Sequence, residues 1–147
     1  MLDRVLSLET AREGTGLKAV SAADCPNPES SPTDPVLPRS LVLHGLCSLA
    51  ELVLEDSGQG RAVLEGIQEA AFSREVRPGE VLTYQVRVEE AESPVSVLSG
   101  EATVEGSEVA RARMVFRWVE TSEEDLSAGW RGLRRLILSG EDPPILR

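Results

Sequence analysis

The only histidine of this 147-residue chain, His44, lies inside a segment that is otherwise almost entirely apolar. The segment runs from Ser40 to Leu54 (SLVLHGLCSLAELVL), and Glu51 is its only acidic residue. Imidazole, with an unperturbed pKa of about 6.5, suits acid–base catalysis near neutral pH. Three roles are therefore open for His44: a hydrogen-bonded core histidine, a general base or acid, or a group that orients a bound substrate.

Two further candidates for chemistry, Ser30 and Asp34, lie in the segment that precedes the apolar one. This segment, from Asp24 to Pro38 (DCPNPESSPTDPVLP), must be a loop, because proline removes backbone donors and restricts the residue before it. Loops longer than about 12 residues inside compact domains are often functional. A nucleophilic pair of Ser30 and His44 is conceivable, since the two need only be neighbours in space, but no third member is identifiable. Asp34 could take an acid–base role or orient His44, or it could be a solvated turn or capping residue.

The two cysteines, Cys25 and Cys47, are too few for a disulfide framework and indicate reduced thiols in a cytoplasmic protein. Cys47 lies in the apolar segment, where it is expected to be a small core residue. The cysteines and the single histidine have no metal-ligand spacing, so we expect no metal and no cofactor. The N-terminal sequence MLDRVLSLETAREG lacks a continuous apolar run, which argues against a secretory signal and for a cytoplasmic location.

The length and charge of the chain restrict its partners. A chain of 147 residues is long enough for one domain with a real core. Its 25 acidic and 15 basic residues give a net charge of −10, so nucleic acid and anionic membrane surfaces are poor partners. The apolar segment is shorter than the roughly 18 residues that a membrane span needs.

The elements that position these residues follow from the hydrophobic pattern. A helix that is apolar on nearly every face must be enclosed, and Pro38 is well placed to begin the one expected over Ser40 to Leu54. Alternating segments before and after it predict antiparallel strands. We expect these strands at Asp3 to Glu9, Gly16 to Ala22, 62–73, 82–89, 95–105 and 110–119, with the first two joined by a turn at Glu13-Gly14. This order predicts an α+β hot-dog fold, in which an antiparallel sheet wraps a central helix.

The C-terminal segment from Ser122 to Ser139 has the pattern of an amphipathic helix. Its apolar stripe consists of Leu126, Trp130, Leu133 and Ile137. We therefore expect a hot-dog domain at residues 1–120, followed by a C-terminal helix and tail at residues 121–147. The helix could dock on the domain or present a surface to a partner.

Several motifs resemble the 3-hydroxyacyl-acyl carrier protein dehydratases of fatty-acid synthesis, the FabA/FabZ-like family. The most specific stretch is GIQEAAFSREVRPGEVL at residues 66–82, which resembles the family signature G-I-x-x-A-x-F-x-x-x-V-x-P-G-D-x-L, with Glu80 where aspartate is usual. MLDRV at the start and the P-x-x-P of Pro35 and Pro38 match further family motifs. The resemblance covers roughly residues 1 to 119.

The resemblance also locates the family active site, in which a loop histidine removes the C2 proton and a helix carboxylate of the other subunit assists departure of the hydroxyl. The family motif H-F-P-G-x-P-x-x-P-G falls on residues 30–39, so Ser30 replaces the catalytic histidine. The motif E-A-x-A-Q falls on residues 44–48, so His44 replaces the carboxylate and Ser48 the glutamine. The resemblance implies substrate contacts at Pro38, Arg39, Gly45 and Ser48.

The resemblance implies a dimeric protein that binds acyl thioesters on acyl carrier protein or coenzyme A. Three functions are open. The first is a dehydratase-like lyase of fatty-acid or polyketide-type metabolism with an altered catalytic pair. The second is a pseudoenzyme that pairs with a catalytic homologue, and the third is an acyl thioesterase that uses Asp34 or His44 to activate water. A single wrapped sheet leaves an edge strand uncovered, which favours a homodimer or such a heterodimer.

Overall fold

The computed structural model describes residues 2–25, 34–56 and 60–120, which form one antiparallel sheet and one long helix. The strands are β1 (Arg4–Glu9), β2 (Glu13–Ala19), β3 (Arg61–Phe72), β4 (Val81–Glu92), β5 (Val95–Val104) and β6 (Ser107–Val119). The helices are the short 3-10 helix η1 (Ala22–Asp24) and α1 (Arg39–Glu55). None of the described helices is long and apolar enough to span a membrane.

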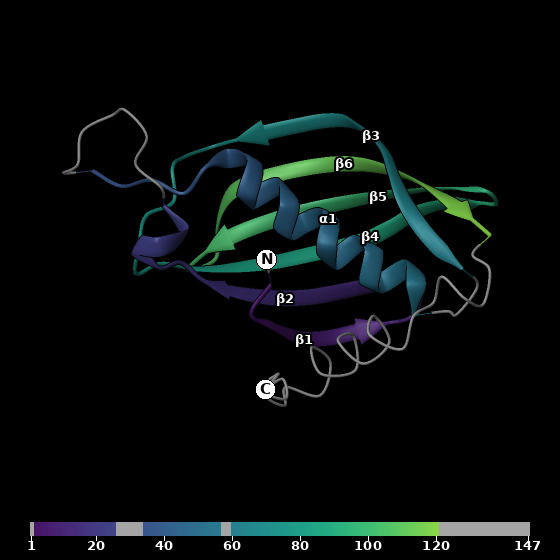
Figure 1. Ribbon diagram of the computed structural model, residues 1–147, viewed down its shortest axis with the longest axis horizontal. Coiled ribbons are helices and arrows are strands. Elements are labelled where there is room, and N and C mark those ends of the chain that lie inside the picture. The colour runs from purple at the N-terminus through teal and green to yellow at the C-terminus, as the bar shows by residue number, and fades with distance from the viewer. Residues whose placement is uncertain (1, 26–33, 57–59, 121–147) are drawn as a thin grey trace, which may run out of the picture.

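The six strands form a single sheet in the order β1-β2-β4-β5-β6-β3, and each neighbouring pair is antiparallel. The sheet curves around α1, which crosses its concave face (Figure 1). Strands β1 and β3 are therefore the two edges of the described sheet. This arrangement is the predicted helix enclosed by an antiparallel sheet.

The sequence pattern located most elements to within a few residues. The helix expected over 40–54 occupies Arg39–Glu55, with Pro38 as its N-cap residue, and the last four strands lie where alternation placed them. Strands β4 and β6 are longer than expected, because their ends continue as hairpins beyond the residues that alternate. The amphipathic helix predicted over 122–139 lies outside the described residues.

The first hairpin differs from the prediction. The turn lies at Thr10 to Arg12, with Ala11 at a φ of 53°, while Glu13 and Gly14 already belong to β2. Gly14 is needed inside the strand because a Cβ there would lie 2.7 Å from a methyl group of Val53 on α1. The turn itself is tied to the helix, since the Ala11 backbone N–H donates to the Val53 carbonyl at 2.9 Å.

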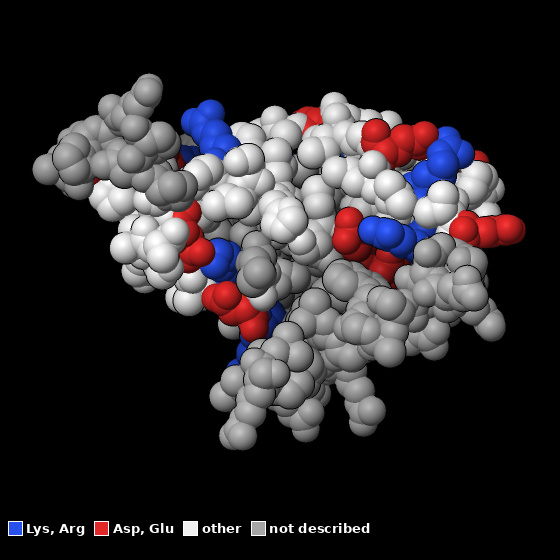
Figure 2. Space-filling model, viewed as in Figure 1, with Lys and Arg blue, Asp and Glu red and all other residues white. Residues whose placement is uncertain are grey.

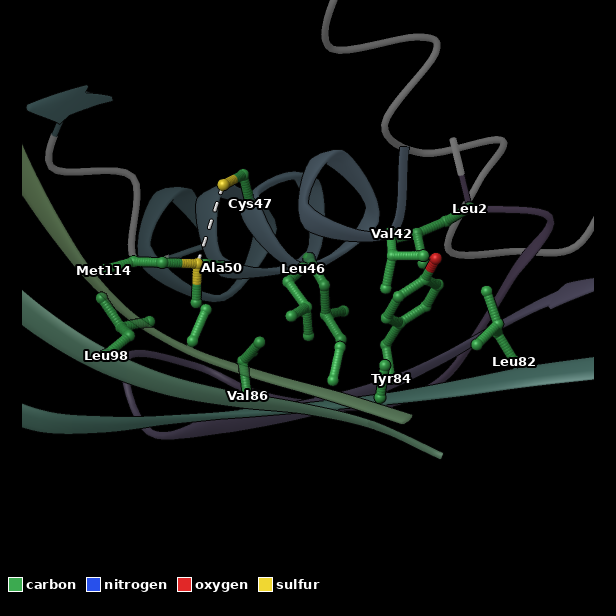
Figure 3. Packing of buried hydrophobic residues seen from close by; sticks show 14 of the residues in the cluster. Leu2, Val42, Leu46, Cys47, Ala50, Leu82, Tyr84, Val86, Leu98 and Met114 are labelled. Carbon is green, nitrogen blue, oxygen red and sulfur yellow. Dashed lines mark hydrogen bonds between the residues drawn. The ribbon is translucent and has the colours of Figure 1, made fainter. Parts of the chain in front are cut away.

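The core lies between α1 and the inner face of the central strands (Figure 3). Its largest fully buried side chains include Tyr84 and Leu82 on β4, Leu98 on β5 and Phe116 on β6. Tyr84 points at Gly45 of α1, where an added Cβ would lie 2.4 Å from the ring carbon Cζ. The sheet and helix can approach this closely only because residue 45 has no side chain.

We predict that Gly45→Ala destabilises the protein, although alanine usually stabilises a helix interior by about 1 kcal/mol relative to glycine. The collision with Tyr84 should outweigh this gain, since overpacking a core typically costs about 1–3 kcal/mol. The free energy of unfolding from urea denaturation measures the balance. Tyr84→Leu is the matched background, in which Gly45→Ala should cost less. A more stable Gly45→Ala protein in the native background would contradict the described packing.

Candidate functional site

The outer side of α1 carries a stripe of polar residues that the sheet does not enclose. The polar stripe consists of Ser40, His44, Ser48 and Glu51, spaced at intervals of three or four residues that place them on one helix face. Ser40 and His44 are exposed and Ser48 and Glu51 are half-buried, while most of the remaining helix is buried. The stripe is thus the accessible part of an otherwise enclosed helix.

His44 is exposed on this stripe, so the alternative of a buried, hydrogen-bonded core histidine is wrong for the described chain. The imidazole is accessible to a ligand that lies along the outer side of α1. Ser48 is one helical turn further, and its hydroxyl donates a 2.8 Å hydrogen bond to the His44 backbone carbonyl. That bond uses the proton of Ser48, so its oxygen is left to a ligand as an acceptor.

Glu51 completes the stripe, and the sequence pattern gave it no role. Burial raises the pKa of its carboxyl, and the neighbouring Glu55 raises it further, against a smaller opposing effect of Arg61. Glu55 is buried, and its Oε1 accepts a 3.0 Å hydrogen bond from the Ala62 backbone N–H at the start of β3. The spacing of His44, Ser48 and Glu51 is the sequence signal that could have identified Glu51.

Gly45 and Cys47 belong to the buried side of α1. Gly45 packs against Tyr84 beneath the helix, as described above. The Cys47 thiol lies 3.7 Å from the Met114 sulfur, and burial raises its pKa to about 11. Cys47 is therefore a protonated core residue, as the sequence suggested.

The start of α1 places two of the predicted substrate-contact residues beside the polar stripe. The Pro38 carbonyl accepts the first helical hydrogen bonds, from the N–H groups of Leu41 and Val42. The Arg39 guanidinium stacks over the Phe72 ring of β3, 5.3 Å from its centroid, while the side chain remains exposed. Arg39 is thus a held positive charge next to the helix N-terminus.

The described structure includes one of the two loop residues predicted to take part in chemistry, Asp34, and it pairs with a group other than His44. Ser30 lies outside the described residues. Asp34 is exposed and forms an ion pair with Arg77, in the turn before β4. The same turn is braced by Arg74, which binds both carboxylate oxygens of Glu80.

Charged groups hold the beginning of the loop. Lys18 is the only lysine of the chain, and its buried ammonium lies 3.2 Å from the Asp24 carboxylate. The same carboxylate accepts 2.8 Å hydrogen bonds from the backbone N–H and the hydroxyl of Ser21. These bonds, the backbone one first, lower the pKa of Asp24 to about 2.

A hollow lies on the outer face of the sheet, opposite α1, and does not include the polar stripe. It has a volume of about 530 Å³ and is lined mainly by charged and polar side chains of five strands. Ion pairs such as Arg87–Glu13 and Arg113–Glu90 cross its strands. These pairs neutralise much of its charge within the chain, so the hollow offers no convergent set of reactive groups.

Comparison with known proteins supports the sequence resemblance. A family model described as a FabA-like domain matches residues 1–113. The 3-hydroxyacyl-(acyl-carrier-protein) dehydratase FabZ of Geobacillus sp. (strain WCH70) is 29% identical over 119 residues, which cover 79% of this chain and 82% of that protein. FabZ of Latilactobacillus sakei subsp. sakei (strain 23K) is 32% identical, covering 79% and 85%.

Solved structures share the fold. The PaaI protein from the phenylacetic acid degradation operon of E. coli matches with a TM-score of 0.67 and 14% identity, covering 80% of each chain. A Streptococcus mutans protein bound to acetyl CoA matches with a TM-score of 0.68 and 14% identity, covering 82% of this chain and 90% of that one. These matches confirm the predicted hot-dog fold.

We predict that Asp24→Asn lowers the free energy of unfolding near pH 7. Because the pKa of Asp24 is about 2 in the folded state and 3.8 ordinarily, its contribution is complete above about pH 4 and disappears as the pH falls through 2. Urea denaturation of both proteins between pH 2 and 7 tests this. The exposed Glu9→Gln, which removes a pair with Arg12, is the control and should have a smaller effect. A difference as large at pH 2 as at pH 7 would contradict the assignment.

Proposed function

Because the chain belongs to the family of FabA-like domains, we propose that it acts on 3-hydroxyacyl thioesters as a dehydratase with an altered catalytic pair. The acyl group is carried by acyl carrier protein or coenzyme A. The named FabZ relatives are acyl-carrier-protein dehydratases, and one protein of the same fold binds acetyl CoA. In fatty-acid or polyketide-type metabolism, the product is an enoyl thioester.

One observation carries this proposal: His44 is exposed on the polar stripe of a helix that is buried elsewhere. It occupies the helix position of the family carboxylate, and an imidazole can exchange protons with a bound substrate at neutral pH. From the start of α1 onward, a thioester that lies along the helix would pass the Arg39 charge, His44 and the Ser48 oxygen in that order. Gly45 packs against Tyr84 on the buried side of the helix and is not accessible to a ligand.

We further propose that two copies assemble and cover the polar stripe. Strand β3 is an open edge of the described sheet, and it carries the exposed apolar side chains Val63 and Ile67. An unpaired edge with apolar residues favours pairing with a second strand, and closing the site would exclude water from the reaction. Light scattering should give twice the 15.9 kDa mass of one chain. A single-chain mass, with no association to a catalytic homologue, would contradict this assembly.

The function is tested with 3-hydroxybutanoyl thioesters of coenzyme A and of acyl carrier protein, by following enoyl absorbance. We expect the full-length protein to interconvert the hydroxyacyl and enoyl forms. His44→Ala should lower kcat by about 10²–10⁴-fold, the usual contribution of a general acid or base. The matched control is Gln85→Ala, which truncates an exposed side chain on the outer face of β4, away from the polar stripe.

Each other outcome rejects either the dehydratase function or the role of His44. Release of free thiol without enoyl formation would identify a thioesterase. An inactive protein that co-purifies with a homologue retaining the family histidine and glutamate would identify a non-catalytic partner. An active protein with unchanged kcat in His44→Ala would eliminate His44 as the base.

A further inference from the structure

We propose that Glu51 is a second catalytic residue, which protonates the leaving hydroxyl while His44 removes the C2 proton. This inference rests on the proposed dehydratase function and names the acid that the function requires. The proposed acid lies seven residues after His44, the position at which the family motif has its carboxylate. The family motifs provide no counterpart for position 51.

The geometry of α1 places the two side chains on one accessible face. Seven residues are within about 20° of two full helical turns, so His44 and Glu51 project in nearly the same direction, with Cα atoms about 10.5 Å apart along the axis. Ser48 lies between them. Because Cα–Cβ bonds of a helix tilt toward its N-terminus, the Glu51 side chain starts in the direction of His44. An acyl thioester lying along the polar stripe could therefore meet His44 at C2 and Glu51 at C3.

Glu51 is the carboxyl of this region that the fold does not use. Among the described residues, the Glu51 carboxylate makes no hydrogen bond or ion pair, although the residue is half-buried. Its neighbour Glu55 is engaged by the Ala62 N–H, and Asp34 is paired with Arg77. An uncommitted carboxyl in a partly desolvated position is costly to maintain, which favours a role toward a ligand.

The surroundings of Glu51 favour its protonated form. The charged and titratable groups that act on it are Glu55 and Cys47 on α1 and Arg61 at the start of β3. Burial and Glu55 raise its pKa, and Arg61 only partly opposes them. Figure 2 shows how charge is distributed around α1. The surface over the middle of the helix is uncharged, and acidic and basic side chains lie next to it toward the C-terminal end of the helix.

The proposed step conserves atoms and charge. The His44 imidazole takes the proton from C2, and the electron pair of that C–H bond forms the C2=C3 double bond. The C3–O bond breaks with its electrons on oxygen, which takes the Glu51 proton and leaves as water. One proton then passes from the His44 imidazolium to the Glu51 carboxylate through solvent, restoring both groups.

The test compares Glu51→Gln and Glu51→Asp with the full-length protein in the 3-hydroxybutanoyl assay. Glutamine has the shape of the acid but no proton to give, so kcat should fall about 10²–10⁴-fold with little change in KM. Aspartate should restore part of the rate. In the pH profile of kcat, the Glu51→Asp variant should still lose activity at high pH, because its acid is deprotonated there. The Glu51→Gln variant should not show this high-pH limb.

Glu69→Gln is the matched control, because it removes the same charge from an exposed site on β3. Glu51→Gln should be at least as stable as the native protein at pH 7, since it removes a carboxylate whose charged form burial disfavours. An inactive native protein would reject the proposed function. An active native protein whose kcat changes less than twofold in Glu51→Gln, or whose high-pH limb survives that change, would overturn this inference alone.

Discussion

The enclosure of α1 by the sheet is the constraint on which the rest of the structure depends. An apolar helix gains stability only if protein covers it, and most residues of α1 are buried in the core that the helix forms with the sheet. Close approach requires missing side chains at Gly14, Gly45 and Gly100, where an added Cβ would lie within 3.0 Å of a packed side chain. The polar stripe lies among the residues of α1 that remain accessible.

Much of the fold could be predicted because hydrophobic periodicity reports burial directly. The alternation of Leu82, Tyr84 and Val86 identified the face of β4 that packs into the core. The near-uniform apolarity of residues 40–54 identified the enclosed helix. The first turn was misplaced because Glu13-Gly14 has the composition of a turn. Gly14 instead makes room for Val53, a contact across about 40 positions of sequence that local patterns do not contain.

The candidate site was less predictable, because the residues that a ligand can reach depend on which side of the helix faces outward. Motif positions identified His44, but a nearly featureless apolar pattern could not show that His44 is exposed while its neighbour Gly45 is buried. The state of Glu51 was also hidden, because it depends on Glu55 and Arg61 and on partial burial. Asp34 looked reactive by its place in the loop, yet its partner Arg77 comes from a turn 43 residues later.

A double-mutant cycle on kcat tests most directly whether His44 and Glu51 act in one chemical step. The rates of His44→Ala, Glu51→Gln and the combined variant are measured for water loss from a 3-hydroxybutanoyl thioester. If both groups act in the same step, the double variant should be about as slow as the slower single variant, since removing one member already disables the pair. Effects that simply multiply, or a double variant as fast as the native protein, would show that the two groups do not act in one step.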